Sequence, residues 1–398
     1  MNGSDAMILT KKIPRIANKK GFTLIELIIV MAIFIVAIIL SSDAFNRIVM
    51  YSKQQMRASE SNIQGVVGLE LMRTDLEHAG YGLPWIMGFE AAFTESTNAA
   101  NSLANGINPT DFNDDNLNST ATAEDANKVP RAVQSKKSTV DERDYLVVKS
   151  TALGSGAAVK KWAYIEGVGG TSTIKVWGES DLDFVEDDRV VTLDSRTRRL
   201  IGTSTSNFSY ALSGSPLAPD ADFQPTQDTD VFVVYGVSGS VDLRSPYNRV
   251  DYYVRRPAEI STRCAAGTGN LYKGVMSHAD GKATAYPLLD CVADLQVVYA
   301  LDTNEDGGVD DYTNEDGLES LSAKQIRAQL KEIRVYILTQ EGQRDRSYNF
   351  PTNDVLVGEN LLGADRGRTF DFAVRGVTDW KNYRWKIYTL VTAPKNIN

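Results

Sequence analysis

Residues 22–40 read FTLIELIIVMAIFIVAIIL, an apolar run of 19 residues with one charged side chain, Glu26. As an α-helix this run spans about 28 Å at about 1.5 Å per residue, which is roughly the hydrocarbon thickness of a bilayer. Basic residues precede it, and the positive-inside rule keeps such residues in the cytoplasm and sends the chain after Leu40 to the outer side. We therefore expect a single membrane-spanning helix with a cytoplasmic N-terminus and an exported body.

The helical pattern continues beyond the apolar run. Apolar side chains recur at spacings of three, four and seven, at Phe45, Ile48, Val49, Met56, Ile63, Val66, Val67, Leu71 and Leu76. Gly80, Gly82 and Pro84 then supply signals that commonly end a helix. The pattern predicts one helix from residue 22 to about residue 79, about 87 Å long. That length suits a helix whose first half spans a membrane and whose second half carries a folded head.

Composition favours a globular body after the helix. The chain has 398 residues, 42% of them hydrophobic and 23% charged, which argues against wholesale disorder and leaves room for one large domain or two to three smaller ones. The net charge of −9 makes nucleic-acid binding an unlikely role, because affinity for phosphate backbones comes from clustered Lys and Arg. Residues 1–21 are basic, so the rest of the chain is more acidic still.

Short β-branched and aromatic runs between turn residues predict a mainly β head over residues 80–398. The runs are Tyr145–Lys149, Trp162–Glu166, Thr173–Trp177, Val190–Leu193, Val231–Tyr235, Val250–Val254, Leu295–Tyr299, Ile333–Leu338, Phe370–Val374 and Trp385–Val391. One helix is expected at about Ala323–Lys331, because Ser322 and Gln325 have the spacing of a capping box. The predicted fold class is α+β, with the long N-terminal helix packed on a mainly antiparallel sheet.

One stretch of the predicted helix and one stretch of the head have compositions that predict local features. Gly65 and Gly68 lie inside the helical pattern, where we expect them to allow close packing against the head rather than to weaken the helix. Residues 94–139 are rich in Asn, Ser, Thr, Asp and Ala and predict a long, loose surface insert. A mobile segment and a contact region both fit that composition.

Cys264 and Cys291 are the only cysteines in the sequence. This number fits one disulfide in an oxidising compartment, and it equally fits two buried free thiols. Export of the head favours the disulfide, whose loop is worth roughly 3 kcal/mol in the chain-entropy model. A catalytic cysteine is not expected, because the sequence shows no base and orienting group for either residue.

Residues 301–317 read LDTNEDGGVDDYTNEDG and contain part of a calcium-loop pattern. Oxygen-bearing side chains alternate around a glycine, as in the first half of such a loop: Asp302, Asn304, Asp306, Gly307 and Asp310. The match fails at position twelve, where Thr313 stands in place of a bidentate Glu. A structural Ca²⁺ site and an acidic, solvated hairpin are therefore both compatible with the pattern.

The residues in front of the apolar run, KKGFTLIE from Lys19 to Glu26, resemble the prepilin peptidase recognition site of type IV pilins and type II secretion pseudopilins. An ordinary secretory signal has its small-residue cleavage site after the apolar region, whereas Gly21 precedes the region here. The resemblance implies cleavage between Gly21 and Phe22, methylation of Phe22 and retention of the helix. Hydropathy alone would fit a plain signal anchor as well.

Glu26 needs a physical reason, because a carboxylate inside an apolar span costs a few kcal/mol on insertion scales. In pilins the Glu at this position is thought to pair with the new N-terminal amine of a neighbouring subunit during assembly. The resemblance thus implies an assembly role for Glu26. A protonated side chain that snorkels towards the membrane surface is the alternative.

Three further segments resemble the PilW-type minor pilins: LELMRTDLEHAGYGLP from Leu69, LYKGV from Leu271 and DCVADLQVVYALDTNEDG from Asp290. The first is also similar, more loosely, to the J-type pseudopilins. The tail departs from the PilW pattern, since this chain ends TAPKNIN and that group often has an arginine-rich ending. The resemblance and the large head imply a minor type IV pilin that primes or caps pilus assembly. A type II secretion pseudopilin and a tip adhesin or DNA-uptake pilin are the alternatives.

The resemblance also implies partners and a location. The expected partners are a prepilin peptidase and methyltransferase, other minor and major pilins, and an inner-membrane assembly platform. The chain is expected as a single-pass inner-membrane protein before assembly, and then in the pilus, the periplasm and at the cell surface. No enzyme activity and no certain cofactor other than the candidate Ca²⁺ are expected, because no acid, base and nucleophile set converges in the sequence.

Overall fold

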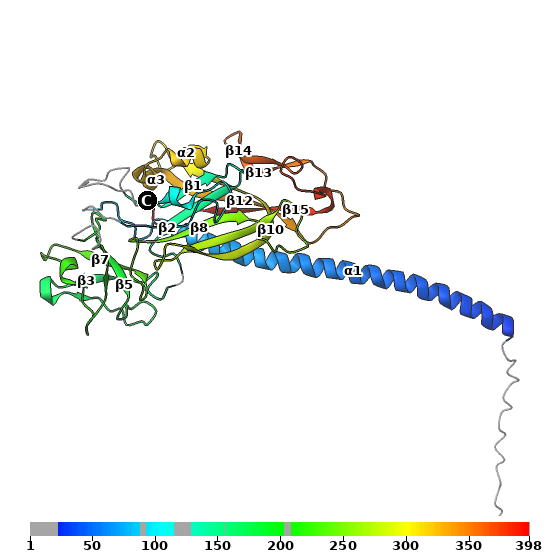
Figure 1. Cartoon of the computed structure of the whole chain (residues 1–398), viewed down its shortest axis with the longest axis horizontal. Coiled ribbons are helices and arrows are strands. Elements are labelled where there is room, and N and C mark those ends of the chain that lie inside the picture. Colours follow the sequence, from blue (N-terminus) through cyan, green and yellow to red (C-terminus); the bar gives the residue numbers. More distant parts are fainter. Residues whose placement is uncertain (1–22, 88–92, 115–128, 155, 203–207, 398) are drawn as a thin grey trace, which may run out of the picture. The chain divides into compact units, whose positions relative to one another are not determined.

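The computed structural model describes residues 23–87, 93–114, 129–154, 156–202 and 208–397 (Figure 1). The chain divides into two compact units, Met1–Met56 and Arg57–Asn398. Helix α1 (Leu24–Glu77) begins in the first unit and ends in the second. The second unit holds the described β-strands and two short helices, α2 (Glu315–Glu319) and α3 (Ala323–Gln329).

The predicted long helix is confirmed as α1, which has 54 residues. Phe22, where it was expected to begin, lies outside the described residues. The helix ends before Gly80 and Gly82, whose φ angles of +80° and +67° lie in the left-handed region that favours glycine. The turn is joined to the sheet at once, because the Gly80 N–H donates to the Lys149 carbonyl oxygen at 3.0 Å.

The larger sheet has eight strands, and all pairings between them are antiparallel. In order across the sheet they are β1 (Val133–Lys137), β2 (Asp144–Ser150), β8 (Asn248–Arg255), β9 (Gly269–Met276), β10 (Ala283–Leu301), β12 (Leu330–Glu341) and β15 (Arg384–Thr392), and β11 (Asp311–Thr313) pairs with β10. The predicted α+β class with a mainly antiparallel sheet is therefore confirmed.

Strand β10 is long enough to pair with its two neighbours through different parts of its length. Residues 283–292 pair with β9, and residues 292–301 pair with β12. The register shifts twice on the β9 side, between Pro287 and Leu289 and between Leu289 and Val292. Such irregularities bend a strand and change the direction of its side chains. Leu289 lies at this irregular point and contacts α1.

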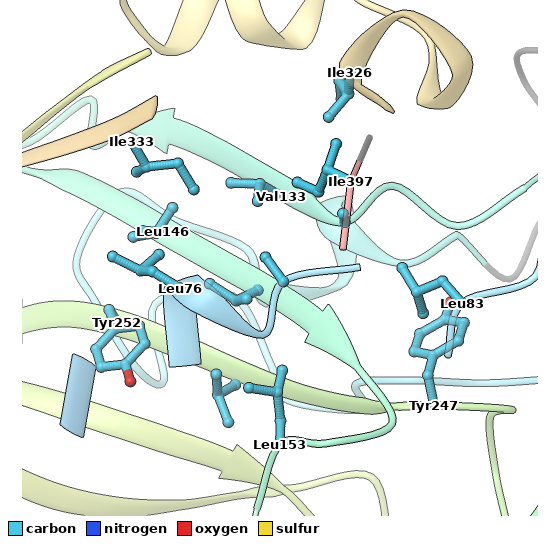
Figure 2. Close-up of a cluster of buried hydrophobic side chains, with 14 of the residues drawn as sticks. Leu76, Leu83, Val133, Leu146, Leu153, Tyr247, Tyr252, Ile326, Ile333 and Ile397 are labelled. Atoms are coloured by element: carbon cyan, nitrogen blue, oxygen red, sulfur yellow. The ribbon is translucent and has the colours of Figure 1, made fainter. Parts of the chain in front are cut away.

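The main core lies where the last turns of α1 meet the larger sheet (Figure 2). Met72 and Leu76 of α1 are fully buried, and Figure 2 shows Leu76 near Leu146 of β2. Ile326 of α3 and Ile397, next to the last residue, extend the same core. Each such side chain contributes about 1.5–3 kcal/mol by leaving water. The helix, the sheet and the end of the chain are thus held by one cluster.

A smaller sheet is inserted between β2 and β8, which are neighbours in the larger sheet. In order across this sheet the strands are β4 (Thr173–Ile174), β3 (Trp162–Glu166), β7 (Phe232–Ser238), β5 (Arg189–Asp194) and β6 (Tyr210–Ala211), and Figure 1 draws them in green. It has a core of its own that includes Val190, Phe223 and Val234. A hairpin of β13 (Asp354–Leu361) and β14 (Ala364–Asp371) is likewise inserted between β12 and β15.

Most of the predicted elements are confirmed, and two strands are shorter than predicted. Residues 175–177 and 372–374, expected at the ends of two strands, lie outside any strand. The capping box of α3 is confirmed, because the Gln325 N–H donates to Ser322 Oγ at 3.2 Å and the Ser322 N–H donates to Gln325 Oε1 at 3.0 Å. Strands β1, β9 and β13 were not predicted, because polar residues and glycines interrupt their apolar pattern.

Residues 94–139 differ from the loose insert expected for them. Strand β1 lies within this stretch and joins the edge of the larger sheet. Leu103 and Phe112 are buried, and the Phe112 ring stacks on Tyr145 of β2 at 5.1 Å between centroids. Residues 115–128 lie outside the described part of the chain. A few apolar side chains therefore help to hold the described part of this polar stretch on the sheet.

Candidate functional site

The first part of α1 exposes an apolar surface along its length. The segment Leu24–Asn46 has 23 residues and a mean hydropathy of 3.1, and none of it is buried against the rest of the structure. Leu27, Ile33 and Phe34, for example, are each more than half exposed. A continuous apolar surface of this kind is rarely left in contact with water. Its length and composition suit a membrane span or contact with other apolar helices.

Glu26, the predicted assembly residue, takes part in a reciprocal cap at the start of this helix. Its Oε2 accepts hydrogen bonds from the Thr23 N–H at 2.9 Å and from Thr23 Oγ1 at 2.8 Å, and its own N–H donates to Thr23 Oγ1 at 3.3 Å. Negative charge is favourable at a helix N-terminus, where the backbone N–H groups are unpaired. The side chain is exposed and can meet a cation of another chain. Gly21 and Phe22, the predicted processing residues, lie outside the described residues.

The last part of α1 packs closely on β10, and two glycines make this possible. A Cβ atom at Gly68 would lie 2.6 Å from the Leu288 carbonyl oxygen, and one at Gly65 would lie 3.1 Å from Leu289 Cδ1. Real Cβ atoms essentially never lie as close to another heavy atom as the first of these distances. The prediction that Gly65 and Gly68 mark close packing against the head is therefore confirmed.

Polar contacts fasten the same end of the helix to the sheet. The Asp75 Oδ2 accepts a hydrogen bond of 2.5 Å from the Tyr252 hydroxyl and pairs with Lys273 Nζ at 2.5 Å. Glu77 pairs with Lys395 at 2.5 Å, close to the end of the chain. The hydrogen bond from Lys395 lowers the pKa of Glu77 below its usual value. Apolar packing and ion pairs thus both hold the C-terminal end of α1 on the larger sheet.

The outward face of this anchored part remains apolar. Val66, Val67 and Leu71 are each at least half exposed, although Met72 one residue further is fully buried. Val67 and Leu71 are four residues apart, which places them on one face of the helix. The helix can therefore offer apolar contacts to other subunits beyond its membrane-length part.

The disulfide expected for the exported head is confirmed. Cys264, in the connection between β8 and β9, is bonded to Cys291 of β10, with their Cα atoms 5.0 Å apart. Both residues are buried. The bond joins the irregular part of β10 to the loop before β9, so it restrains the region on which α1 packs.

The candidate calcium loop is not supported by the geometry. The Asp302 carboxylate accepts hydrogen bonds from the N–H groups of Asp306 at 3.0 Å and Gly307 at 2.8 Å, and it pairs with Lys331 Nζ at 3.2 Å. The Asp310 carboxylate accepts from the N–H and hydroxyl of Thr303. Within the described ranges, His, Cys, Asp and Glu side chains form no group of three or more that could hold a metal ion. The structure therefore gives no support to the calcium prediction for Asp302, Asn304, Asp306 and Asp310.

Local backbone bonds explain the acidic pattern instead. The Asn304 side-chain oxygen also accepts from the Asp306 N–H at 3.0 Å, so the loop oxygens stabilise the turn itself. The turn leads from β10 into β11, which pairs with β10. These bonds agree with the acidic hairpin, which was the other interpretation of the sequence.

A buried charge cluster was missed by the sequence analysis. It consists of Glu95, Asp114, Lys149, Arg249 and Asp251, all of them buried. Lys149 Nζ donates to Glu95 Oε1 at 2.9 Å and to Asp114 Oδ2 at 2.6 Å, and Arg249 donates to both Asp251 oxygens at 2.7 and 2.8 Å. Burial acts to raise the pKa of Asp114, but Lys149 and Arg131 hold it below the usual value. Arg131, which pairs with Asp114 at 3.2 Å, brings the basic residues to three against three acidic ones, and these ion pairs fasten residues 93–114 to the sheet.

In the sequence, this cluster is visible only as charged residues within strands that are otherwise apolar. Lys149 lies near the end of one such strand, and Asp251 lies inside another. Such a residue is exposed in most sheets, because alternate side chains usually face water. Both faces of β2 and β8 are covered here, and every residue of β2 is buried. The sequence pattern of the strand therefore did not show where its charges would lie.

An exposed, membrane-length apolar helix that continues into an antiparallel β head places this chain in the pilin-like class. The family model of the type IV pilus-assembly protein W matches residues 251–395, and the prokaryotic N-terminal methylation motif matches residues 16–42. Together these two matches support a type IV pilin-like protein of the PilW type. A search of the curated proteins and a search of the solved structures found no match.

These two matches support a general function for the chain as a minor pilin of the type IV pilus. The methylation motif implies processing by a prepilin peptidase, anchoring in the membrane and assembly with other pilins. The matched regions belong to structural subunits rather than to catalytic domains. The matched C-terminal region begins within β8 and extends just past β15, so it excludes the smaller sheet.

Proposed function

We propose that this chain is a low-copy minor pilin that primes or caps assembly of the type IV pilus and has no enzymatic role. The observation that carries the proposal is the exposed apolar surface of Leu24–Asn46 directly behind a methylation motif. Such a surface is stable in a bilayer before assembly and among other apolar helices afterwards. The same helix can therefore serve as a membrane anchor first and as a fibre contact later.

The processing step in this proposal is cleavage between Gly21 and Phe22, followed by methylation of Phe22. The basic leader stays in the cytoplasm, the helix remains in the inner membrane and the head lies on the outer side. Removal of the leader creates a new amine on Phe22, close to Glu26 in the chain. A cationic N-terminus then becomes available to neighbouring subunits and to the assembly platform.

Glu26 is proposed to pair with the N-terminal amine of a neighbouring subunit during assembly. Its carboxylate is exposed and held in place by Thr23, so it can meet that amine without first becoming ordered. An unpaired charge in an apolar environment is costly, and pairing with an amine offsets part of that cost. The pair would thus set the axial position of one subunit against the next.

The head gives support to a minor rather than a major role. Its larger sheet carries two insertions, the smaller sheet and the β13–β14 hairpin, which make it bulky for a subunit that repeats along a narrow fibre. A few copies at one end of the fibre avoid this crowding. A type II secretion pseudopilin remains the second candidate, because it shares the N-terminal chemistry.

The test combines mass spectrometry of the mature N-terminus with quantitative proteomics of sheared fibres. We expect a mature chain that begins with N-methylated Phe22, present in far fewer copies than the main subunit. Glu26→Ala is expected to lose fibre incorporation while it is still processed and retained in the membrane. Glu70→Ala serves as the matched control, because Glu70 is an exposed glutamate on the same helix.

Three results would contradict the proposal. A precursor that keeps residues 1–21 would exclude prepilin processing, and a dominant copy number would exclude a minor role. Normal fibre incorporation of Glu26→Ala would remove the proposed pairing with a neighbouring amine. Loss of secretion with intact pili in a strain without the protein would favour the pseudopilin.

A further inference from the structure

The edge of the smaller sheet carries three aromatic rings in mutual contact. Trp162 and Tyr164 belong to β3, and Trp177 lies on the segment that returns beside this strand. The Lys175 N–H donates to the Tyr164 carbonyl oxygen and Trp177 Nε1 donates to the Trp162 carbonyl oxygen, both at 2.9 Å. The ring centroids are 5.1 Å apart for Trp162 and Trp177, 5.4 Å for Trp162 and Tyr164, and 6.3 Å for Tyr164 and Trp177. The rings form a platform that is fixed by backbone hydrogen bonds.

This platform is open to solvent. Tyr164 is 40% exposed, Trp177 38% and the adjacent Val176 60%. Leu182 and Val185, a few residues further, are also exposed. Grouped exposed aromatic and aliphatic side chains mark interaction surfaces more often than single ones do, and Trp and Tyr are enriched at binding hot spots. The group lies outside the residues that the PilW family model matches.

Acidic residues follow Trp177 closely in the chain. Residues 175–187 carry five acidic side chains, at Glu179, Asp181, Asp183, Glu186 and Asp187, against the single basic side chain of Lys175. Lys175 is paired with Glu166 at 3.1 Å, so its charge is already compensated. The Asp183 carboxylate accepts from the Trp177 N–H at 2.5 Å and the Gly178 N–H at 3.0 Å, which fixes the turn beside Trp177. The net charge of residues 175–187 is therefore negative.

Cations cover several comparable rings elsewhere in this head. Arg327 lies over Trp85 at 5.0 Å, Arg384 over Tyr348 at 4.4 Å and Lys381 over Trp380 at 5.2 Å from the ring centroids. Among the described residues, none of the cations that lie over an aromatic ring lies over the three rings of the platform. Aromatic faces beside an acidic segment attract cations both through the ring quadrupole and through direct charge.

We propose that the acidic aromatic surface, defined as Trp162, Tyr164, Val176, Trp177, Glu179 and Asp181, docks a basic segment of a partner protein. An Arg or Lys side chain lies over Trp177 or Tyr164, and neighbouring basic residues pair with Glu179 and Asp181. This inference goes beyond the proposed assembly role and does not rest on it. A second copy of this chain is a poor occupant because the chain carries a net charge of −9. A neutral sugar would contact the rings but leave the carboxylates unpaired.

The test is calorimetric titration of the full chain in detergent micelles at physiological salt. The probes are a synthetic peptide of alternating Arg and Ser, its Lys and Glu counterparts, and maltohexaose as a neutral sugar. The Arg peptide is expected to bind best. Trp177→Ala should weaken its binding about fivefold or more, as expected when a cation loses its ring, and Glu179→Gln with Asp181→Asn should weaken it further and reduce its salt dependence.

Matched variants separate this surface from general attraction to an acidic protein. Val374→Ser removes an exposed apolar side chain at another place, and Asp354→Asn removes an exposed carboxylate at another place. Both variants should bind the Arg peptide as the unchanged chain does. If Trp177→Ala does not fold, Tyr164→Ser and Trp177→Leu replace it, with the thermal unfolding midpoint as the control for folding. Equal affinity of these variants and the unchanged chain overturns the proposal. Equal or tighter binding of the Glu peptide or of maltohexaose overturns it as well, and so does self-association that Trp177→Ala abolishes.

Discussion

The two ends of α1 differ in how much of their surface is buried. Leu24–Asn46 is apolar on all sides and is not buried, whereas the part from Gly65 to Glu77 buries one face on the sheet and leaves the other exposed. The difference comes from the side chains: branched apolar residues all round in the first part, and glycines, charges and a single buried stripe in the second. A helix that is apolar all round needs an apolar solvent or other helices, while an amphipathic one can use its own head.

The largest expected effect comes from placing charge on each part in turn. Ile33→Arg with Val36→Arg should sharply reduce membrane retention, since each arginine costs about 2.5–3.5 kcal/mol at a helix centre on insertion scales. Val67→Arg with Leu71→Arg, on the exposed face of the anchored part, should leave retention unchanged. Carbonate-resistant membrane fractions measure both. Equal retention of the two double variants would show that Leu24–Asn46 is not the membrane anchor.

The second prediction compares two leucines five residues apart on the anchored part. Leu76 is fully buried and Leu71 is half exposed. Leu76→Ala should lower the free energy of unfolding of the head by about 2–5 kcal/mol, through lost burial and the cavity left behind, whereas Leu71→Ala should change it by about 0.5 kcal/mol or less. Urea unfolding followed by tryptophan fluorescence gives both values. A similar loss for Leu71→Ala would mean that the outer face is covered by the head.

Gly68→Ala tests the close approach of helix and strand. Alanine favours a helix over glycine by about 1 kcal/mol, but its Cβ would lie 2.6 Å from the Leu288 carbonyl oxygen. We expect a net loss of about 1–3 kcal/mol, because backbone atoms have to move apart. Val67→Ala, at an exposed neighbouring position, should have little effect in the same unfolding assay. An increase in stability for Gly68→Ala would show that the contact yields easily.

The smallest expected effect concerns the ion pair between Glu77 and Lys395. Lys395 lowers the pKa of Glu77, so the stabilisation is present above the unfolded-state pKa of Glu and is lost as the pH falls through and below it. Because Lys395 is mostly exposed, Lys395→Ala should cost about 0.5 kcal/mol at pH 7 and nothing measurable near pH 3. Unfolding of both chains at the two pH values checks this. A cost that does not change with pH would assign the contribution of Lys395 to packing.

Local patterns predicted the elements that local forces produce. The helix of α1, its end before Gly80 and Gly82, and the capping box at Ser322 all depend on residues within a few positions of one another. The Cys264–Cys291 bond could also be predicted from the sequence, because two cysteines in an exported chain have only one possible pairing. The acidic pattern at Asp302 had two interpretations, and its oxygens accept local backbone hydrogen bonds that the sequence did not show.

The sequence by itself determined that this chain has a membrane-length apolar helix behind a processing motif, because hydropathy and a short motif need no tertiary contact. Tertiary structure alone decided which face of that helix would be buried, how the smaller sheet would be inserted between β2 and β8, and that Lys149 and Arg249 would lie inside the head. These features depend on pairings between residues far apart in the chain, whose free energies no local pattern encodes.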